Sequence, residues 1–300
     1  MLNIAIIGIG LIGSSIARYI RSTNKEVVIN IVDNSQLALE KSKKLNLGNN
    51  YFENMSECKD ENEIIFICTP ISGYKLIFEE LQKLKISNKT IITDVGSSKS
   101  EIIKLAQNIL SENIKFVPAH PIAGTEQSGP ESGFEGLFKN KWLVITPCKN
   151  SDDESIKVIS NLWKSFGCKI QLMDMNDHDS IMAITSHIPH IIAYNIVGTA
   201  SNLEDNLKEE VIKYSASGFR DFTRIASSDP TMWRDIILSN KVPILKMLDK
   251  FEKDLDGLKD AIKNEDKEKL FNIFNKTRDI RKRIIDEGQD VKEPNFGRKN

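Results

Sequence analysis

The glycine-rich run Gly8-Ile-Gly10-Leu-Ile-Gly13 constrains the fold of this chain more than any other segment does. It follows the apolar run Leu2–Ile7 and opens a helical pattern over Leu11–Arg21. In this arrangement the first glycine allows a tight turn, the second lets backbone approach a pyrophosphate, and the third lets the helix pack closely on the sheet. The helix N-terminus then offers free N–H groups to the phosphates. We therefore expect a bound dinucleotide that contacts Gly8, Gly10, Leu11, Ile12 and Gly13.

Asp33 lies at the end of the second predicted strand, twenty residues beyond Gly13. A carboxylate there can accept hydrogen bonds from both ribose hydroxyls and would repel a 2′-phosphate. The next residues, Asn34-Ser35-Gln36, supply no arginine for that phosphate, so the sequence favours NAD over NADP. Thr69 and Pro70 follow another predicted strand and are expected at the same cofactor site. The alternatives are a structural glycine turn with a solvated Asp33, and an FAD site, for which nothing later in the chain indicates a flavin domain.

Short apolar runs alternate with helical patterns up to about Leu172, which predicts an α/β domain with a parallel, doubly wound, Rossmann-like sheet. The predicted strands are Leu2–Ile7, Val27–Val32, Ile64–Cys68, Thr90–Thr93, Lys115–Ala119, Leu143–Thr146 and Lys169–Leu172. The predicted helices are Leu11–Arg21, Gln36–Lys44, Tyr74–Lys83, Ser98–Leu110 and Glu154–Phe166.

After Met173 the strand signal disappears, and an all-α domain is expected. Its predicted helices are Ile181–Ser201, Lys208–Ser215, Met232–Phe251 and Leu255–Asp286. Two of them are long and apolar on one face, so we expect them to pack on each other or on a second subunit. The expected division is therefore a dinucleotide domain over 1–172, a helical substrate and dimerisation domain over 173–288, and a loose tail over 289–300.

Composition excludes several classes of function. The net charge of −1 gives no basic surplus for nucleic acid, and no polybasic block indicates a membrane surface. The N-terminus lacks the basic segment of a signal peptide, and we expect no apolar run to reach the length of a membrane span. None of the four cysteines forms a Cys-x-x-Cys pair, which favours free thiols in a cytoplasmic enzyme.

His120 is the most informative candidate for chemistry. It stands in His120-Pro-Ile-Ala-Gly-Thr-Glu126, directly after a predicted strand, and Asp94-Val-Gly-Ser-Ser-Lys99 follows the neighbouring one. In an open parallel sheet, ligands collect at the carboxyl ends of the strands, where these loops and the glycine turn should meet. A titratable imidazole beside a dinucleotide suggests proton transfer coupled to hydride transfer. The alternative for His120 alone is an ordinary capped loop histidine.

The helical half carries a second group of polar residues, beginning with Ser186-His187-Ile-Pro189-His190. Two histidines three residues apart could bind a metal, but no third ligand has plausible spacing, although His178 and Asp179 are nearby. We therefore predict no metal site and favour a histidine that reaches the interdomain cleft. Arginines follow among aromatic residues, which suits carboxylate recognition, with solvated salt bridges as the alternative. These arginines are Arg220, Arg224 and Arg234.

Taken together, these motifs resemble the prephenate/arogenate dehydrogenase family of tyrosine biosynthesis. The resemblance extends from Met1 to about Asp286 and includes Asp221-Phe-Thr-Arg-Ile-Ala-Ser-Ser-Asp-Pro-Thr-Met-Trp233. It implies NAD-dependent oxidative decarboxylation of prephenate, arogenate or both, and a homodimer formed by the helical domain. Because no further domain-length segment follows Asp286, no separate regulatory module is expected.

The resemblance also implies roles for individual residues. His120 would accept the proton of the ring hydroxyl, and Ser97 would orient that hydroxyl. Substrate contacts are implied for Arg224, which would hold a carboxylate, and for His187, Thr125, Glu126, Ser228 and Trp233. The second carboxylate partner and the contact that separates prephenate from arogenate are not assigned. Rival interpretations are a β-hydroxyacid dehydrogenase, disfavoured because Ile181–Ser201 contains no lysine, and a non-catalytic NAD-responsive protein, which would have no use for His120.

Overall fold

The computed structural model describes residues 2–23, 26–58, 61–84, 86–202, 209–211 and 213–286. The chain divides into two compact units, Met1–Ile244 and Leu245–Asn300. Within the described residues, all strands belong to the first unit, and the second is helical.

The first unit contains a six-stranded sheet in which all neighbouring strands run parallel. Its strand order is β3-β2-β1-β4-β5-β6, which is the order of a doubly wound dinucleotide-binding sheet. The predicted Rossmann-like fold is therefore confirmed. The strands are β1 (Asn3–Ile7), β2 (Val28–Val32), β3 (Asn50–Phe52), β4 (Ile64–Ile67), β5 (Ile91–Asp94) and β6 (Lys115–Val117). The sequence did not predict β3, a three-residue edge strand.

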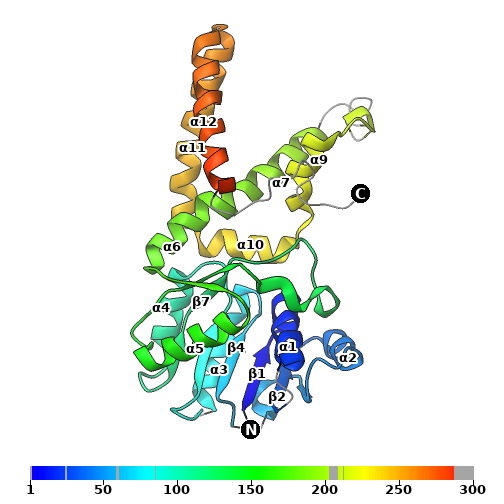
Figure 1. Ribbon diagram of the computed structural model, residues 1–300, viewed down its shortest axis with the longest axis vertical. Coiled ribbons are helices and arrows are strands. Elements are labelled where there is room, and N and C mark those ends of the chain that lie inside the picture. The colour runs from blue at the N-terminus through cyan, green and yellow to red at the C-terminus, as the bar shows by residue number, and fades with distance from the viewer. Residues whose placement is uncertain are drawn as a thin grey trace. The chain divides into compact units, whose positions relative to one another are not determined.

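Helices cover both faces of this sheet because successive strand side chains point in opposite directions (Figure 1). In β1, Ile4 and Ile6 join a core with Ile16 and Trp163, whereas Ala5 and Ile7 join a second core with residues of α3 and α4. Both faces are therefore buried, which explains the continuous apolar runs of the strands. The helices are α1 (Leu11–Thr23), α2 (Gln36–Lys44), α3 (Tyr74–Lys83), α4 (Ser100–Ile109) and α5 (Asp153–Ser165).

The predicted strand Lys115–Ala119 is wrong as a single element. Pro118 separates β6 from β7 (Ala119–Pro121), because proline has no N–H to donate to a strand ladder. The strand β7 instead pairs antiparallel with β8 (Trp142–Ile145), which pairs parallel with β9 (Lys169–Leu172) in a second, three-stranded sheet. His120 therefore lies within β7, opposite Val144, and not in a loop after a strand.

The helical part of the first unit begins earlier than predicted. It contains α6 (Met175–Met182), a π-helical turn (Ala183–His187) and α7 (Ile188–Ser201), which are consecutive along the chain. Pro189 stands in the first turn of α7, and it has no N–H to donate to the preceding turn. That preceding turn is the wider, π-helical one. Further along are α9 (Ser217–Thr223), the 3₁₀ turn Arg224–Ser227 and α10 (Pro230–Ser239).

By length and composition alone, the helical stretch Met175–Ser201 could cross a membrane, with a mean hydropathy of 1.2. This overturns the expectation that no apolar segment would be long enough. The same stretch holds the buried polar side chains of His178, Asp179 and His187. Asp179 accepts hydrogen bonds from backbone N–H groups at the start of α4, a contact typical of a helix packed in a protein core.

Two long predicted helices are interrupted in the structure. The predicted helix Met232–Phe251 is divided at the buried Asn240 into α10 and α11 (Lys241–Lys263). The predicted helix Leu255–Asp286 is broken before α12 (Lys267–Asp286), where Glu265 has a φ of 51°. The predicted helix Lys208–Ser215 includes residues 208 and 212, which lie outside the described residues, as does the predicted tail 289–300.

The second unit exposes several large apolar side chains on its helices. They include Leu255, Ile262, Phe271, Phe274 and Ile280, which are each at least 43% exposed.

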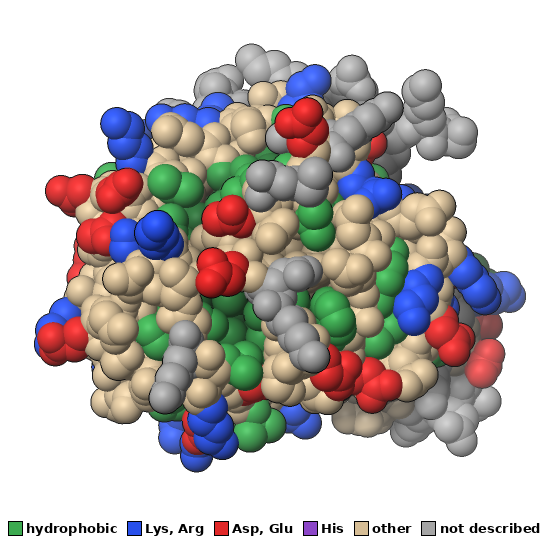
Figure 2. Space-filling model, turned by 90° about the horizontal axis from the view of Figure 1, so that it is seen from below, with side chains coloured by type: hydrophobic (Ala, Val, Ile, Leu, Met, Phe, Trp, Pro, Cys, Tyr) green, Lys and Arg blue, Asp and Glu red, His purple; other side chains and the backbone are tan. Residues whose placement is uncertain are grey.

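On the face shown in Figure 2, acidic and basic side chains are interspersed, which agrees with the near-zero net charge of the sequence.

Candidate active site

The glycine turn has the geometry of a dinucleotide site. Gly8 has a φ of +92°, and a Cβ added to it would lie 2.7 Å from the backbone of Cys68. A Cβ on Gly13 would lie 2.2 Å from the Gly8 carbonyl oxygen, so both positions need glycine for the fold itself. A Cβ on Gly10 would meet nothing within 4 Å. The fold does not require glycine at Gly10, which leaves close approach of a ligand as its reason.

Asp33 stabilises this turn through hydrogen bonds to backbone N–H groups. Its Oδ2 accepts a hydrogen bond from the Ile9 N–H at 2.9 Å, and its Oδ1 accepts one from the Ser35 N–H at 2.9 Å. Each carboxylate oxygen keeps lone-pair capacity for a ribose hydroxyl. Thr69 borders the same turn, because its Cγ2 is among the atoms nearest to a Cβ built on Gly8. Leu11 and Ile12 begin α1, so their N–H groups belong to the first helical turn, and Pro70 follows Thr69 at the end of β4.

His120 is buried and its Nδ1 lies 2.9 Å from Nε2 of His178. His178 Nδ1 in turn lies 2.8 Å from Oδ1 of Asp179, so three buried side chains form one hydrogen-bonded series. Burial holds the pKa of His120 well below its ordinary value, and His178, Lys99 and His187 lower it further. His120 is therefore a neutral imidazole near pH 7, as a proton acceptor must be.

A buried ion pair holds the backbone immediately before His120. Lys99 Nζ lies 2.5 Å from Asp94 Oδ2, and both side chains have no exposed surface. Lys99 also donates to the Ala119 carbonyl at 2.7 Å, while the Ala119 N–H donates to Asp94 Oδ1 at 3.0 Å. Tyr74 adds a hydrogen bond from its hydroxyl to Asp94 at 3.0 Å. The Ala119 carbonyl is thus held by the Lys99 ammonium group, and the Ala119 N–H is held by the Asp94 carboxylate.

Ser97 lies in the loop between β5 and α4 and is partly exposed. Among the described residues its hydroxyl has no hydrogen-bond partner, so it is free to meet a ligand. The structure shows no direct hydrogen bond between Ser97 and His120. The two residues nevertheless follow segments that are neighbours in the structure, because β5 pairs with β6 and the Ala119 N–H donates to Asp94.

His187 is fully buried and accepts a hydrogen bond at Nδ1 from the Asn240 amide at 2.9 Å. Burial lowers its pKa to about 4 from 6.5. With Nδ1 as acceptor, the neutral ring carries its proton on Nε2, which has no hydrogen-bond partner within the described residues. The backbone of Ser97 raises the pKa of His187, so this ring faces the loop that carries Ser97. Trp233 packs edge-on against His187 and stacks on His190.

Arg224 and Glu126 form an ion pair, with Nη1 2.5 Å from Oε2. One comes from the turn after α9 and the other from the loop after β7, so the pair joins the helical part to the sheet part. Thr125 Oγ1 accepts a hydrogen bond from the Gln127 N–H at 3.2 Å, which shapes that loop. Ser228 is buried, and its carbonyl accepts a hydrogen bond from the Tyr194 hydroxyl at 2.7 Å.

Sequence reasoning missed the roles of four residues near His120. His178 and Asp179 were weighed only as neighbours of a possible metal site, and Lys99 and Asn240 received no role. The adjacent pair of a histidine and an aspartate beside an apolar helix was a usable signal, because buried charged groups need partners. The described residues contain no group of three or more His, Cys, Asp or Glu side chains placed to hold a metal ion.

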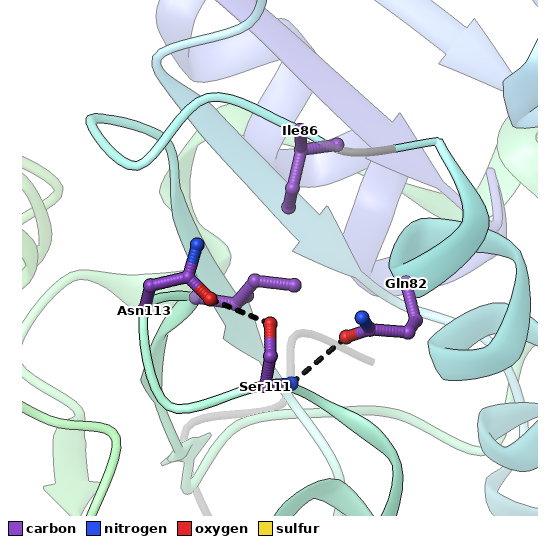
Figure 3. A pocket seen from close by; sticks show the side chains of 5 residues that line it. Gln82, Ile86, Ser111 and Asn113 are labelled. Carbon is purple, nitrogen blue, oxygen red and sulfur yellow. Dashed lines mark hydrogen bonds between the residues drawn. The ribbon is translucent and has the colours of Figure 1, made fainter.

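A cavity of about 310 Å³ lies elsewhere, lined by Gln82, Ile86, Ser111, Asn113 and Ile114 (Figure 3). It is found where α3 and α4 end and β6 begins, and therefore at the sheet edge opposite the glycine turn. Gln82 Oε1 accepts a hydrogen bond from the Ser111 N–H, and the Ser111 hydroxyl donates to Asn113 (Figure 3). With no titratable side chain in its lining, this cavity offers no acid or base chemistry.

Two family models match successive parts of this chain. Residues 16–172 match the model of the prephenate dehydrogenase nucleotide-binding domain, and residues 174–276 match that of the prephenate dehydrogenase dimerization domain. The cyclohexadienyl dehydrogenase of Zymomonas mobilis is 36% identical over 279 residues, which cover 93% of this chain and 94% of that protein.

Two solved structures are also similar. The crystal structure of prephenate dehydrogenase from Aquifex aeolicus in complex with hydroxyphenyl propionate and NAD+ has a TM-score of 0.88 and 32% identity, covering 95% of this chain and 98% of that one. The crystal structure of Synechocystis arogenate dehydrogenase has a TM-score of 0.77 and 29% identity, covering 94% and 99% of the two chains.

Proposed function

The chain belongs to the prephenate dehydrogenase family, and from that premise we propose how its residues carry out an NAD-dependent oxidative decarboxylation. The reaction belongs to tyrosine biosynthesis. Its substrate is a cyclohexadiene, prephenate and/or arogenate, with a ring carboxylate opposite a ring hydroxyl. The carbon that bears the hydroxyl loses hydride, the hydroxyl loses its proton, and the ring loses carbon dioxide. Prephenate yields 4-hydroxyphenylpyruvate and arogenate yields tyrosine.

The observation that carries this mechanism is the buried, neutral imidazole of His120 at the sheet edge that holds the glycine turn. We assign His120 as the acceptor of the hydroxyl proton, since a positioned base contributes about 10²–10⁴-fold to a rate. Ser97, whose hydroxyl has no hydrogen-bond partner in the part of the chain that the structure describes, orients the same substrate hydroxyl. Aromatisation of the ring supplies the driving force for loss of carbon dioxide, so the residues need only bind, orient and accept a proton.

The residues around the glycine turn fit NAD. Bound NAD supplies the acceptor for the hydride. The open space beside Gly10, the N-terminus of α1 and the carboxylate of Asp33 would hold its pyrophosphate and ribose. Thr69 and Pro70 would border it at the end of β4.

Substrate binding is assigned to the helical part and the loop after β7. Arg224 would hold a carboxylate of the substrate by exchanging its partner Glu126 for that carboxylate, because Glu126 is itself a partly exposed carboxylate that pairs with this guanidinium. Thr125 and Glu126 would gate the pocket. His187, Trp233 and Ser228 would line it, with the Nε2–H of His187 as a hydrogen-bond donor.

The remaining assignments concern the whole molecule. We propose that residues 1–172 form the cofactor domain and 173–288 the substrate and dimerisation domain. A homodimer would cover the exposed apolar side chains of α11 and α12. The four cysteines are free, which is in keeping with a cytoplasmic location.

The test is NADH formation by purified protein with prephenate or arogenate, each combined with NAD or NADP. We expect NADH from at least one substrate with NAD, and little product with NADP. His120→Asn should lower kcat by about 10²–10⁴-fold and change KM little. An inactive wild-type protein that binds NAD would refute the proposed reaction, and unchanged turnover by His120→Asn would remove His120 from it.

A further inference from the structure

We infer that His178 and Asp179 are positioning residues that fix the tautomer of His120, leaving its Nε2 unprotonated toward the substrate. The three side chains form one series, with His120 Nδ1 2.9 Å from His178 Nε2 and His178 Nδ1 2.8 Å from Asp179 Oδ1. The inference rests on the proposed role of His120 as base. It adds two residues that act through His120.

The series has a defined direction because Asp179 is held as a carboxylate. Its Oδ1 accepts the N–H of Lys99 at 2.8 Å, and its Oδ2 accepts the N–H of Ser100 at 2.9 Å. These two N–H groups form the N-terminus of α4, whose own residues supply no side-chain cap. Asp179 therefore caps α4 from another helix, where the helix dipole favours negative charge. Although burial opposes it, the hydrogen bonds from His178, Ser100 and Lys99 leave the pKa of Asp179 lowered.

The protons of both imidazoles follow from that carboxylate. A carboxylate only accepts hydrogen bonds, so His178 Nδ1 must carry a proton. Burial lowers the pKa of His178, which makes the ring neutral and leaves its Nε2 as an acceptor. His120 must then donate from Nδ1, and the lone pair of its neutral ring lies on Nε2. Without His178, neither tautomer of His120 would be preferred by this contact.

The charged groups around the series agree with this assignment. Lys99 and His187 are the other groups that lower the pKa of His120, and Lys99 is already paired with Asp94. When Nε2 of His120 takes the hydroxyl proton, the ring becomes an imidazolium. Its Nδ1–H bond to His178 then gains strength as a charge-assisted hydrogen bond, and the charge of Asp179 lies one ring further on. The series therefore offsets part of what burial costs the protonated base.

The experiment compares His178→Gln with His178→Leu in the full chain. Glutamine keeps an acceptor for the His120 Nδ1–H, whereas leucine removes it at similar volume. Both variants should bind NADH as the wild type does, because His178 lies outside the cofactor residues. For His178→Leu we expect kcat to fall by roughly 10–100-fold, the cost typical of a lost orienting partner, with KM changed much less. His178→Gln should recover most of that loss. The acidic limb of the kcat–pH profile should move in His178→Leu.

A spectroscopic measurement tests the tautomer without any reference to activity. The chain has four histidines, so protein labelled with ¹⁵N-histidine gives four imidazole patterns, which the variants assign. We expect His120 with a protonated Nδ1 in the wild type and in His178→Gln, and a loss of that preference in His178→Leu. A protonated Nε2 on wild-type His120 would overturn the inference. So would a His178→Leu variant that keeps the wild-type kcat and pH profile, or a His178→Gln variant no better than His178→Leu. An inactive wild type with the expected tautomer would refute the reaction and leave the tautomer assignment standing.

Discussion

Replacement of Lys99 by methionine tests how the buried ion pair supports the site. Methionine keeps most of the apolar stem but leaves the Asp94 carboxylate without a cation in a position with no exposed surface. Breaking a buried pair by removing one partner costs about 3–5 kcal/mol. Three donors to Asp94 remain, from Tyr74, Gly96 and Ala119, so we expect a loss near the lower end, about 3 kcal/mol. Against a total stability of roughly 5–15 kcal/mol, such a loss is easily measured.

The assay is urea unfolding followed by tryptophan fluorescence. Trp163 is fully buried beside Phe66 and Phe138, so its emission should report unfolding of this core. Adding Asp94→Asn to Lys99→Met removes both charges and should recover part of the lost stability, because no unpaired charge remains buried. The matched control is Lys149→Met, which breaks the exposed pair with Glu112 and should leave the midpoint unchanged.

Two outcomes would refute this reasoning. One is a loss of less than about 1 kcal/mol for Lys99→Met, which is the range of an exposed pair and not of a buried one. The other is a double variant less stable than Lys99→Met alone. A folded Lys99→Met variant should also turn over more slowly than wild type, since the Ala119 carbonyl loses its donor one residue before His120.

Three further perturbations separate binding, folding and pH effects. Arg224→Ala should raise KM for the substrate with a smaller change in kcat, whereas Arg220→Ala, a change at an exposed arginine, should alter neither; equal kinetics for both variants would make Arg224 structural. Gly10→Ala should fold normally but bind NADH more weakly in a fluorescence titration, whereas Gly13→Ala should lower the melting temperature because its Cβ meets the Gly8 carbonyl; normal NADH affinity in Gly10→Ala would contradict the assigned cofactor contact. The pKa of folded His187 is lowered to about 4 from 6.5, so between those values the unfolded chain binds the extra proton and stability falls as pH falls, by up to about 1.4 kcal/mol per pH unit. Urea midpoints for His187→Leu should decline less steeply over this window, and an identical slope would exclude His187 as a contributor.

The sheet was predictable because its signals are local. Gly13 is required by a contact with Gly8, five residues earlier, and the apolar strands are buried on both faces. The contact that requires Gly8 is with Cys68, after the neighbouring strand β4, yet the glycine spacing that indicates the turn lies within a few residues. The division at Pro118 was missed although proline is a known strand breaker. A run of apolar residues continued through it, and the pairing of β7 with β8 depends on a strand more than twenty residues away.

The site was less predictable because its hydrogen bonds join distant segments. His120 could be identified by its place near the glycine turn, but its partner His178 lies fifty-eight residues away in a helix of the other half. Asn240 was expected inside a continuous helix. Its amide instead donates both to the Asp179 carbonyl, at 2.8 Å, and to His187, and it interrupts the helix there. Long-range polar contacts of this kind leave no periodic pattern in a sequence.

The position of Asp179 gives these contacts a common consequence. The same carboxylate caps α4, which packs on the sheet, and orients His178, which orients His120. Asp179 belongs to α6. The unprotonated Nε2 of His120 is therefore directed toward the substrate only when α6 packs against the start of α4. Removal of α6 from that position would free two N–H groups of α4 and the Nδ1 proton of His120 together. Formation of the base and docking of the helical part on the sheet part therefore depend on one set of hydrogen bonds, and a substitution that loosens this docking should lower kcat before it affects binding of the cofactor.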